Sequence, residues 1–64
     1  MKRIKVEIVN QSGTQRKFAQ EVGIHETTLS NIISGVLQAN EDQKELIVKA
    51  LGGRYTWDEL MEEI

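Results

Sequence analysis

The chain has 64 residues, of which 28% are charged and 39% hydrophobic, and its formal net charge is −2. This length allows one small domain over residues 1–64 and leaves little room for a substrate pocket beside a core, so we do not expect an enzyme. Without Cys and with a single His, the sequence excludes disulfides, zinc fingers and a His-rich metal site, and we expect no cofactor and no small-molecule ligand.

The first segment fits two patterns. Ile4, Val6 and Ile8 alternate with charged residues, which is typical of a strand. Ile4 and Ile8, with Val9 beside Ile8, also fit one face of a helix. No second strand is available for pairing, and a lone strand leaves its backbone groups without partners. We therefore predict a helix here, with a strand over residues 3–9 as the alternative.

A second helix is predicted over residues 15–22. Thr14 can cap its amino end with its hydroxyl, and Gly23 suits a left-handed stop at its carboxyl end. Three apolar residues share one face of this helix: Phe18, Ala19 and Val22.

A third helix is predicted over residues 26–34, directly after a tight turn at residues 23–25. Its apolar stripe consists of Leu29, Ile32 and Ile33, at helical spacing. His25, in the turn, has three interpretations: it caps the third helix, it reaches a phosphate when protonated, or it fills the turn. We favour the last.

Two capping boxes mark the remaining helices. Asn40 heads one that we expect to end at Gly52, and Thr56 opens a short last helix. In a chain of this size we expect apolar residues at helical spacing to lie in the core. The expected inward residues are Leu46, Ile47, Ala50, Leu51, Trp57, Leu60, Met61 and Ile64. Together these segments predict an all-α domain of four or five short helices.

The unit from residue 15 to residue 34 reads QRKFAQEVGIHETTLSNIIS. Ala19 is small where the two helices must cross closely, and Gly23 supplies the turn conformation. The residues expected to fill the angle between these helices are Phe18, Val22, Ile24, Leu29 and Ile32. This pattern resembles the helix-turn-helix of the lambda-repressor/Cro-type (xenobiotic-response-element) DNA-binding family.

The resemblance extends over roughly the whole chain. Thr14-Gln15 stands where that family often has Thr-Gln, and residues 46–52 followed by Trp57-Asp58-Glu59-Leu60 look like its last two helices. The resemblance implies a compact four- to five-helix lambda-repressor-like domain, with residues 15–34 as the helix-turn-helix unit.

The resemblance also implies that the helix over residues 26–34 enters the major groove of DNA. Short polar residues face away from its apolar stripe, and an Asn there can bond adenine N6 and N7 as a pair. Glu26 can accept from cytosine N4 or cap the helix, and we favour the cap. The expected base-reading residues are Glu26, Thr27, Ser30 and Asn31.

Phosphate contacts are expected at the start of the helix over residues 15–22, where unpaired N–H groups and the helix dipole favour an anion. Residues 1–17 carry a net charge of +4, against −2 over residues 18–40 and −4 over residues 41–64. The basic amino-terminal stretch can therefore add charge there. The expected phosphate-contacting residues are Thr14, Gln15, Arg16, Lys17 and Ser34, although Arg16 and Lys17 also fit a solvated helix face.

The sequence departs from the family pattern in having no Lys or Arg between Lys17 and Lys44. One subunit should therefore neutralise few phosphates, and a homodimer reading two half-sites is the usual remedy. Exposed parts of five apolar residues could form its surface: Val36, Leu37, Trp57, Met61 and Ile64.

We thus expect sequence-specific binding of double-stranded DNA by a small transcriptional regulator, most simply a repressor of phage or mobile-element type. The longest apolar run, Leu46-Ile47-Val48, is too short for a membrane span or a signal-peptide core, so we expect a cytoplasmic location in a bacterial or phage-infected cell and no membrane contact. The alternative is a protein-interaction module that does not read DNA, which the acidic carboxyl-terminal third and the uncharged polar face of residues 26–34 favour.

Overall fold

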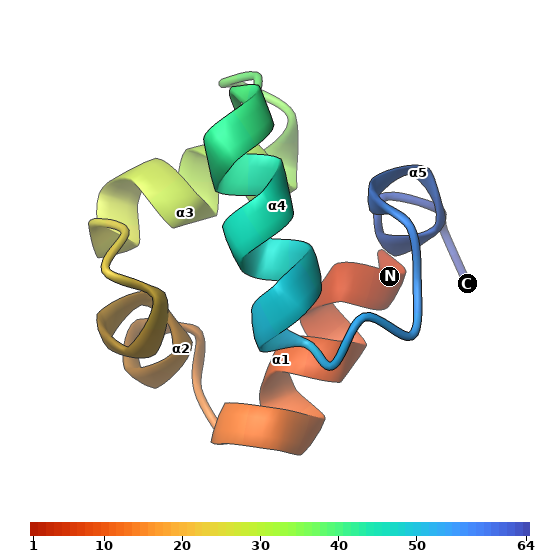
Figure 1. Ribbon diagram of the computed structural model, residues 1–64, viewed down its shortest axis with the longest axis horizontal. Coiled ribbons are helices and arrows are strands. Elements are labelled where there is room, and N and C mark those ends of the chain that lie inside the picture. The colour runs from red at the N-terminus through yellow and green to blue at the C-terminus, as the bar shows by residue number, and fades with distance from the viewer.

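The computed structural model describes all of residues 1–64 and contains five α-helices and no β-sheet (Figure 1). The all-α prediction is therefore confirmed. In Figure 1, α2 and α3 lie on one side of the molecule, α5 lies on the other, and α4 crosses the space between them. The helices are α1 (Arg3–Ser12), α2 (Gln15–Val22), α3 (Glu26–Ser34), α4 (Glu41–Ala50) and α5 (Trp57–Leu60).

The first segment is a helix, as predicted, and the strand alternative is excluded. Ile4 and Ile8, one helical turn apart, are fully buried, whereas Val9 is exposed. The only β-type pairing in the chain is an isolated bridge between Lys2 and Glu63, outside the helix. With no neighbouring strand to accept its N–H groups, the segment satisfies its backbone internally.

The caps of α2 are those that the sequence predicts. The Thr14 hydroxyl accepts the Lys17 N–H at 3.1 Å, and Gly23 ends the helix in the left-handed conformation at φ 75°. Phe18 and Ala19 are buried against the core, and Val22 is half-buried at its edge.

The preferred interpretation of His25 as a turn filler is wrong. Its Nδ1 atom accepts the Thr27 N–H at 3.2 Å, so the imidazole caps the amino end of α3. A ring nitrogen with a lone pair satisfies an unpaired helix donor in the same way as the Ser or Thr oxygen that usually stands at such a position.

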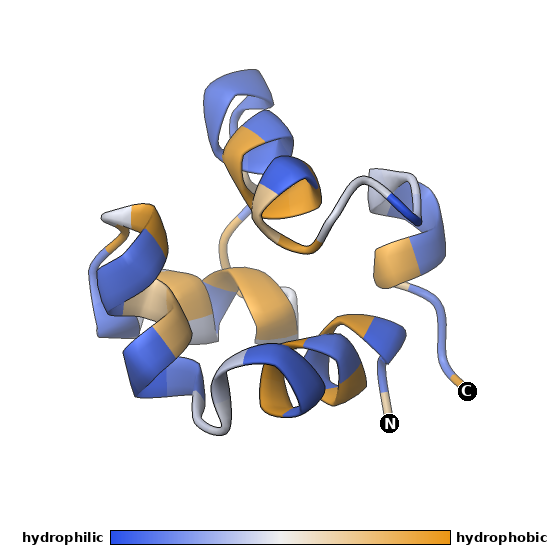
Figure 2. Ribbon diagram, turned by 60° about the horizontal axis from the view of Figure 1, so that its bottom comes forward, coloured by the Kyte–Doolittle hydropathy of each residue, from blue (hydrophilic) through white to orange (hydrophobic).

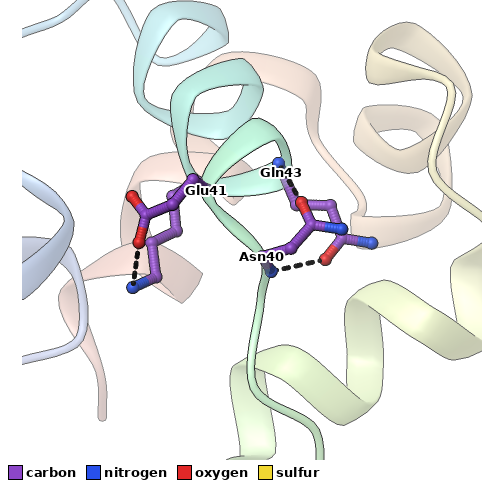
Figure 3. Close-up of polar contacts among 4 residues, drawn as sticks. Asn40, Glu41 and Gln43 are labelled. Atoms are coloured by element: carbon purple, nitrogen blue, oxygen red, sulfur yellow. Dashed lines mark hydrogen bonds and ion pairs between the residues drawn. The ribbon is translucent and has the colours of Figure 1, made fainter.

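Both predicted capping boxes are present. Figure 3 shows the first, in which the Asn40 side chain accepts the Gln43 N–H at 2.8 Å while the Gln43 side chain accepts the Asn40 N–H at 2.9 Å. Thr56 and Glu59 make the same exchange at α5. The first of these helices, α4, ends at Ala50, before the expected Gly52, because the chain begins to reverse at Leu51 and Gly52 takes φ 86°.

The core draws on all five helices. Every helix in Figure 2 carries both hydrophobic and hydrophilic residues, as expected where each helix covers one side of a shared core. The buried cluster consists of Ile4, Ile8, Phe18, Ala19, Ile24, Leu29, Ile33, Ile47, Leu51 and Leu60, and Ile32 is buried as well. Trp57, Met61 and Ala50 are partly buried against it.

Two of the apolar residues expected in the core, Leu46 and Ile64, are exposed. Leu46 is 49% exposed, because the inward stripe of α4 runs through Ile47 and Leu51, one turn apart, and Leu46 lies about 100° round the helix from Ile47. Ile64 is exposed beyond the end of α5. Val36, which is 78% exposed, and the less exposed Leu37 lie in the segment between α3 and α4.

The two ends of the chain lie side by side. The Arg3 N–H donates to the Glu62 carbonyl at 2.9 Å, and the Ile64 N–H donates to the Met1 carbonyl at the same distance. These bonds hold α5 and the following residues against the start of α1. None of the five helices has the length and apolar character needed to cross a bilayer.

Candidate nucleic-acid interface

The predicted polar residues of α3 lie on the side of the helix that faces away from the core. Its buried residues are Leu29, Ile32 and Ile33, which fix the orientation of the helix about its own axis. Of the predicted base-reading residues, Glu26, Thr27 and Ser30 are exposed and Asn31 is half-buried. Ser34 is exposed at the carboxyl end.

The polar side chains of this face are largely free to bind a ligand. The side chains of Thr27, Ser30 and Asn31 take part in no hydrogen bond within the protein, whereas the Ser34 hydroxyl donates to the Asn31 carbonyl at 3.2 Å. The amide of Asn31 therefore keeps both its donor and its acceptor for an external partner.

α3 is held at both ends. His25 caps its amino end, and at its carboxyl end the Lys2 ammonium donates to the Ile33 carbonyl at 2.6 Å. A cation at this end complements the helix dipole and satisfies a carbonyl that has no partner inside the helix. Sequence reasoning missed this role of Lys2, because nothing local marks a contact between residues that are 31 positions apart.

The amino end of α2 has donors to spare. The Thr14 hydroxyl is already used by the Lys17 N–H, but the N–H groups of Gln15 and Arg16 have no partner in the protein. Gln15 is half-buried, and Arg16 and Lys17 are exposed. Two free N–H groups at the positive end of a helix dipole favour an anion.

A cleft of about 360 Å³ brings part of the predicted site together. It lies where α1, α2 and α3 meet, and its walls include Gln15, Ser30 and Ser34. Gln15 and Ser34, both expected at phosphate, thus lie beside Ser30, which was expected at a base. Thr14 and Lys17 lie outside this cleft.

Two predicted site residues of opposite charge pair with each other. The Arg16 Nε atom lies 3.7 Å from a Glu26 carboxylate oxygen, and both side chains are more than half exposed. Glu26 lies in the first turn of α3, where its negative charge is favourable to the helix dipole. Glu26 was expected to cap this helix, but His25 makes the cap. In the free protein, Arg16 and Glu26 therefore partly cancel each other's charge.

The carboxyl-terminal residues add two carboxylates with altered acidity. Hydrogen bonds from the Thr56 backbone and side chain hold the pKa of Glu59 below its usual value. The amino group of Met1, 2.9 Å from Glu63, lowers the pKa of that carboxyl through a hydrogen bond and charge attraction. Glu63 also lines the cleft.

The chain contains no group of three or more His, Asp or Glu side chains placed to hold a metal ion. Comparisons with protein-family models, with curated proteins and with solved structures found no match to this chain. The interpretation of the site therefore rests on the placement of its own residues.

Proposed function

We propose that this protein binds double-stranded DNA in a sequence-specific manner, with a lambda-repressor-like arrangement in which α3 enters the major groove. The observation that carries the proposal is the outer face of α3. The side chains of Thr27, Ser30 and Asn31 make no internal hydrogen bond, while His25 and Lys2 hold the two ends of the helix. A fixed helix that presents unsatisfied short polar groups is suited to reading base edges.

In this proposal, Thr27 and Asn31 read bases, with Ser30 at the edge of the same face. The Asn31 amide can bond adenine N6 and N7 as a pair, and the methyl group of Thr27 can contact thymine. Glu26 either accepts from cytosine N4 or acts on the site through Arg16. The phosphate contacts come from Gln15, Arg16, Lys17 and Ser34, with Thr14 supporting the helix start.

We also propose that two copies act as a homodimer. The segment directly after α3 exposes Val36 and Leu37, and a groove of about 290 Å³ next to it is lined by Leu37, Trp57 and Met61. Lys44 is the one cation of this groove, and the segment between α3 and α4 has none. One copy of the protein therefore has few phosphate contacts to add here. A second copy would cover these apolar groups and double the number of phosphates neutralised.

Occupying an operator in this way is sufficient for repression. We therefore propose a small transcriptional repressor of phage or mobile-element type that acts on DNA in the cytoplasm of its host.

A second candidate function is that of a protein-interaction module. On the outer face of α4, the exposed Leu46 lies in a shallow depression together with Asp42, Glu45 and Lys49. An apolar side chain beside two carboxylates suits a partner surface that is apolar and basic. In that case α3 would not need to contact DNA at all.

The experiment that tests the proposal is selection from a random duplex library at low and moderate salt, followed by sequencing of the retained DNA. We expect an enriched motif with two inverted half-sites about one helical turn apart. A single short site would retain DNA reading but exclude the dimer. No enrichment at either salt, from protein with a helical circular dichroism spectrum, would overturn the proposal in favour of the protein-interaction module.

A further inference from the structure

The cleft between α1, α2 and α3 is lined by charged residues that were not among the predicted site residues. Besides Gln15, Ser30 and Ser34, its walls include the side chains of Lys2, Lys5 and Glu63. Lys2 and Lys5 come from the start of the chain and Glu63 from its end, because the two ends are paired beside the cleft.

The two lysines of the cleft differ in what they already bind. The Lys2 ammonium is half-buried and donates to the Ile33 carbonyl, so it is fixed in the wall. Lys5 is exposed, and it makes no ion pair and no side-chain hydrogen bond within the protein. Lys5 is therefore the cation of the cleft that is free to meet an anion.

The one carboxylate in the cleft is already paired. The Glu63 carboxylate lies 2.9 Å from the amino group of Met1, and these opposite charges largely cancel. The two lysines then leave the cleft with a net positive charge. An exposed carboxylate weakens anion binding only in part when a cation lies this close to it.

The cleft also has uncharged hydrogen-bond donors. The amide of Gln15 and the hydroxyl of Ser30 line the same cleft and make no hydrogen bond within the protein. The free N–H groups of Gln15 and Arg16 lie at the adjoining end of α2. Since Ser30 and Ser34 are exposed residues of α3, the cleft borders the face that we propose reads bases.

We propose that this cleft binds one phosphodiester group of the DNA backbone, with Lys5 as its charged contact and Gln15 and Ser30 as hydrogen-bond donors. The inference rests on the proposed DNA-binding function and deepens it. It adds Lys5 on α1 to the interface and assigns Ser30 to the backbone. Three helices would then hold the same phosphate beside the base-reading residues, which fixes how far along the groove α3 lies.

The test compares Lys5→Gln with Lys49→Gln, which removes the same charge from an exposed position on α4. Affinity for the selected duplex is measured by fluorescence anisotropy over a series of salt concentrations. For Lys5→Gln we expect binding about five- to tenfold weaker at about 0.1 M salt, with the slope of log affinity against log salt smaller by about 0.9. Sequence preference should not change, because a phosphate contact carries no base information.

Glu63→Gln provides a change of the opposite sign in the same cleft. Removing this carboxylate should tighten binding to the duplex severalfold, whereas Glu45→Gln on α4 should have a smaller effect. The backbone bonds that join the chain ends do not involve the Glu63 carboxylate, so the pairing of the ends survives this substitution.

Single neutral methylphosphonates placed along the selected duplex then locate the contact. At one position, the replacement should weaken DNA binding by the wild-type protein. It should have little further effect on binding by Lys5→Gln, because that variant has already lost the contact between Lys5 and the phosphate. If wild-type protein binds its motif but Lys5→Gln and Lys49→Gln behave alike, the cleft is not a phosphate site and this inference is overturned, while the proposed function stands. If wild-type protein selects no motif, the proposed function fails first.

Discussion

Among single residues, Arg16 and Glu26 form the ion pair that bears most directly on the proposed DNA binding. A guanidinium expected at phosphate lies 3.7 Å from a carboxylate expected at a base. Exposed ion pairs of this kind stabilise a protein by only about 0–1 kcal/mol, so DNA can separate them at little cost. In the proposed complex, repulsion between the Glu26 carboxylate and the DNA phosphates would affect binding more than the loss of this ion pair does.

We therefore expect Glu26→Gln to bind DNA about two- to fivefold more tightly than the wild-type protein, and most clearly at low salt. The measurement is a salt series of anisotropy titrations, with Glu45→Gln as the control for a change in overall charge. If Glu26 reads cytosine instead, affinity will fall at the selected motif and one C·G preference will disappear from a repeated selection.

Asn31 offers the sharpest test of base reading. Its side chain makes no hydrogen bond within the protein, so Asn31→Ala should leave the free energy of unfolding nearly unchanged. If the amide bonds an adenine, the substitution should remove about 1–3 kcal/mol of discrimination at one base pair. Competition among duplexes that differ at single positions measures this loss. An unaltered preference at every position would contradict the role assigned to Asn31.

At the scale of the helices, α3 is held by the packing of its buried side against the shared core and by contacts at its two ends. Leu29, Ile32 and Ile33 bury one side, and His25 caps the amino end. The contact from Lys2 is different, because it ties the carboxyl end of α3 to the start of the chain. The stability of α3 is thus linked to that of α1 and of the residues before it.

Lys2→Met tests this link, because it keeps most of the side-chain length and removes the ammonium. Hydrogen bonds that involve a charged group contribute about 1.5–3 kcal/mol, and we expect a loss near the lower limit for this half-buried contact. Urea denaturation measures the loss, and amide hydrogen exchange should show faster opening of residues 32–34 than of α2. Equal changes throughout the chain would indicate a general destabilisation instead.

The capping box of α5 gives a pH dependence whose sign can be worked out. Hydrogen bonds to Thr56 hold the pKa of Glu59 in the folded protein below its usual value, so the charged carboxylate stabilises the fold at pH above that usual value. This contribution is lost as the pH falls through the lowered pKa. Glu63 acts in the same direction.

We expect the urea midpoint of the wild-type protein to fall between about pH 5 and about pH 2, and to fall less for Glu59→Gln. Glutamine keeps an acceptor for the Thr56 N–H but cannot be protonated in this range. Asp42→Asn changes a carboxylate on α4 that makes no side-chain hydrogen bond and no ion pair within the protein, and it serves as the control. Parallel curves for wild type and Glu59→Gln would contradict this account.

The sequence predicted the helices well because their boundaries depend on neighbouring residues. Thr14, Asn40 and Thr56 cap helices through bonds that span three positions, so these starts could be recognised without the fold. The apolar stripe of α3 was predicted for the same reason. Leu46 was misplaced because α4 has apolar residues on adjacent faces, and only packing decides which face turns inward.

The composition of the candidate site depends more on the fold. The outer face of α3 followed from helical periodicity, whereas the contacts of Lys2 with Ile33 and of Arg16 with Glu26 join residues from different segments. Their formation depends on how helices cross, which no local pattern encodes. The same holds for the cleft, to which residues from both ends of the chain contribute.

At the scale of the whole molecule, the exposed segment between α3 and α4 is the surface through which we propose that two copies form a homodimer. Val36 is 78% exposed and belongs to no helix, so Val36→Asp should change the free energy of unfolding of one subunit by no more than about 0.5 kcal/mol. If this segment joins two copies, a buried charge there should abolish the dimer. Sedimentation velocity and titration of a duplex with two half-sites measure the two effects.

Unchanged sedimentation and affinity in Val36→Asp would exclude this segment as the dimer surface. Leu46→Asp on α4 is the matched control, because Leu46 is also exposed but lies away from the proposed contact. A loss of association in the Leu46 variant alone would instead point to the outer face of α4.

The pairing of the chain ends has a consequence for the order in which the molecule forms and opens. A bond between Ile64 and Met1 closes a loop as long as the entire chain, whereas the caps and helix bonds close loops of a few residues. Because closing a longer loop costs more conformational entropy, the ends should join late in folding and separate early in local opening. Lys2 forms the isolated bridge with Glu63 and also donates to the Ile33 carbonyl. When the chain ends separate, we therefore expect the carboxyl end of α3 to lose its contact with Lys2 as well. Fraying at the termini would thus reach the helix that we propose reads DNA.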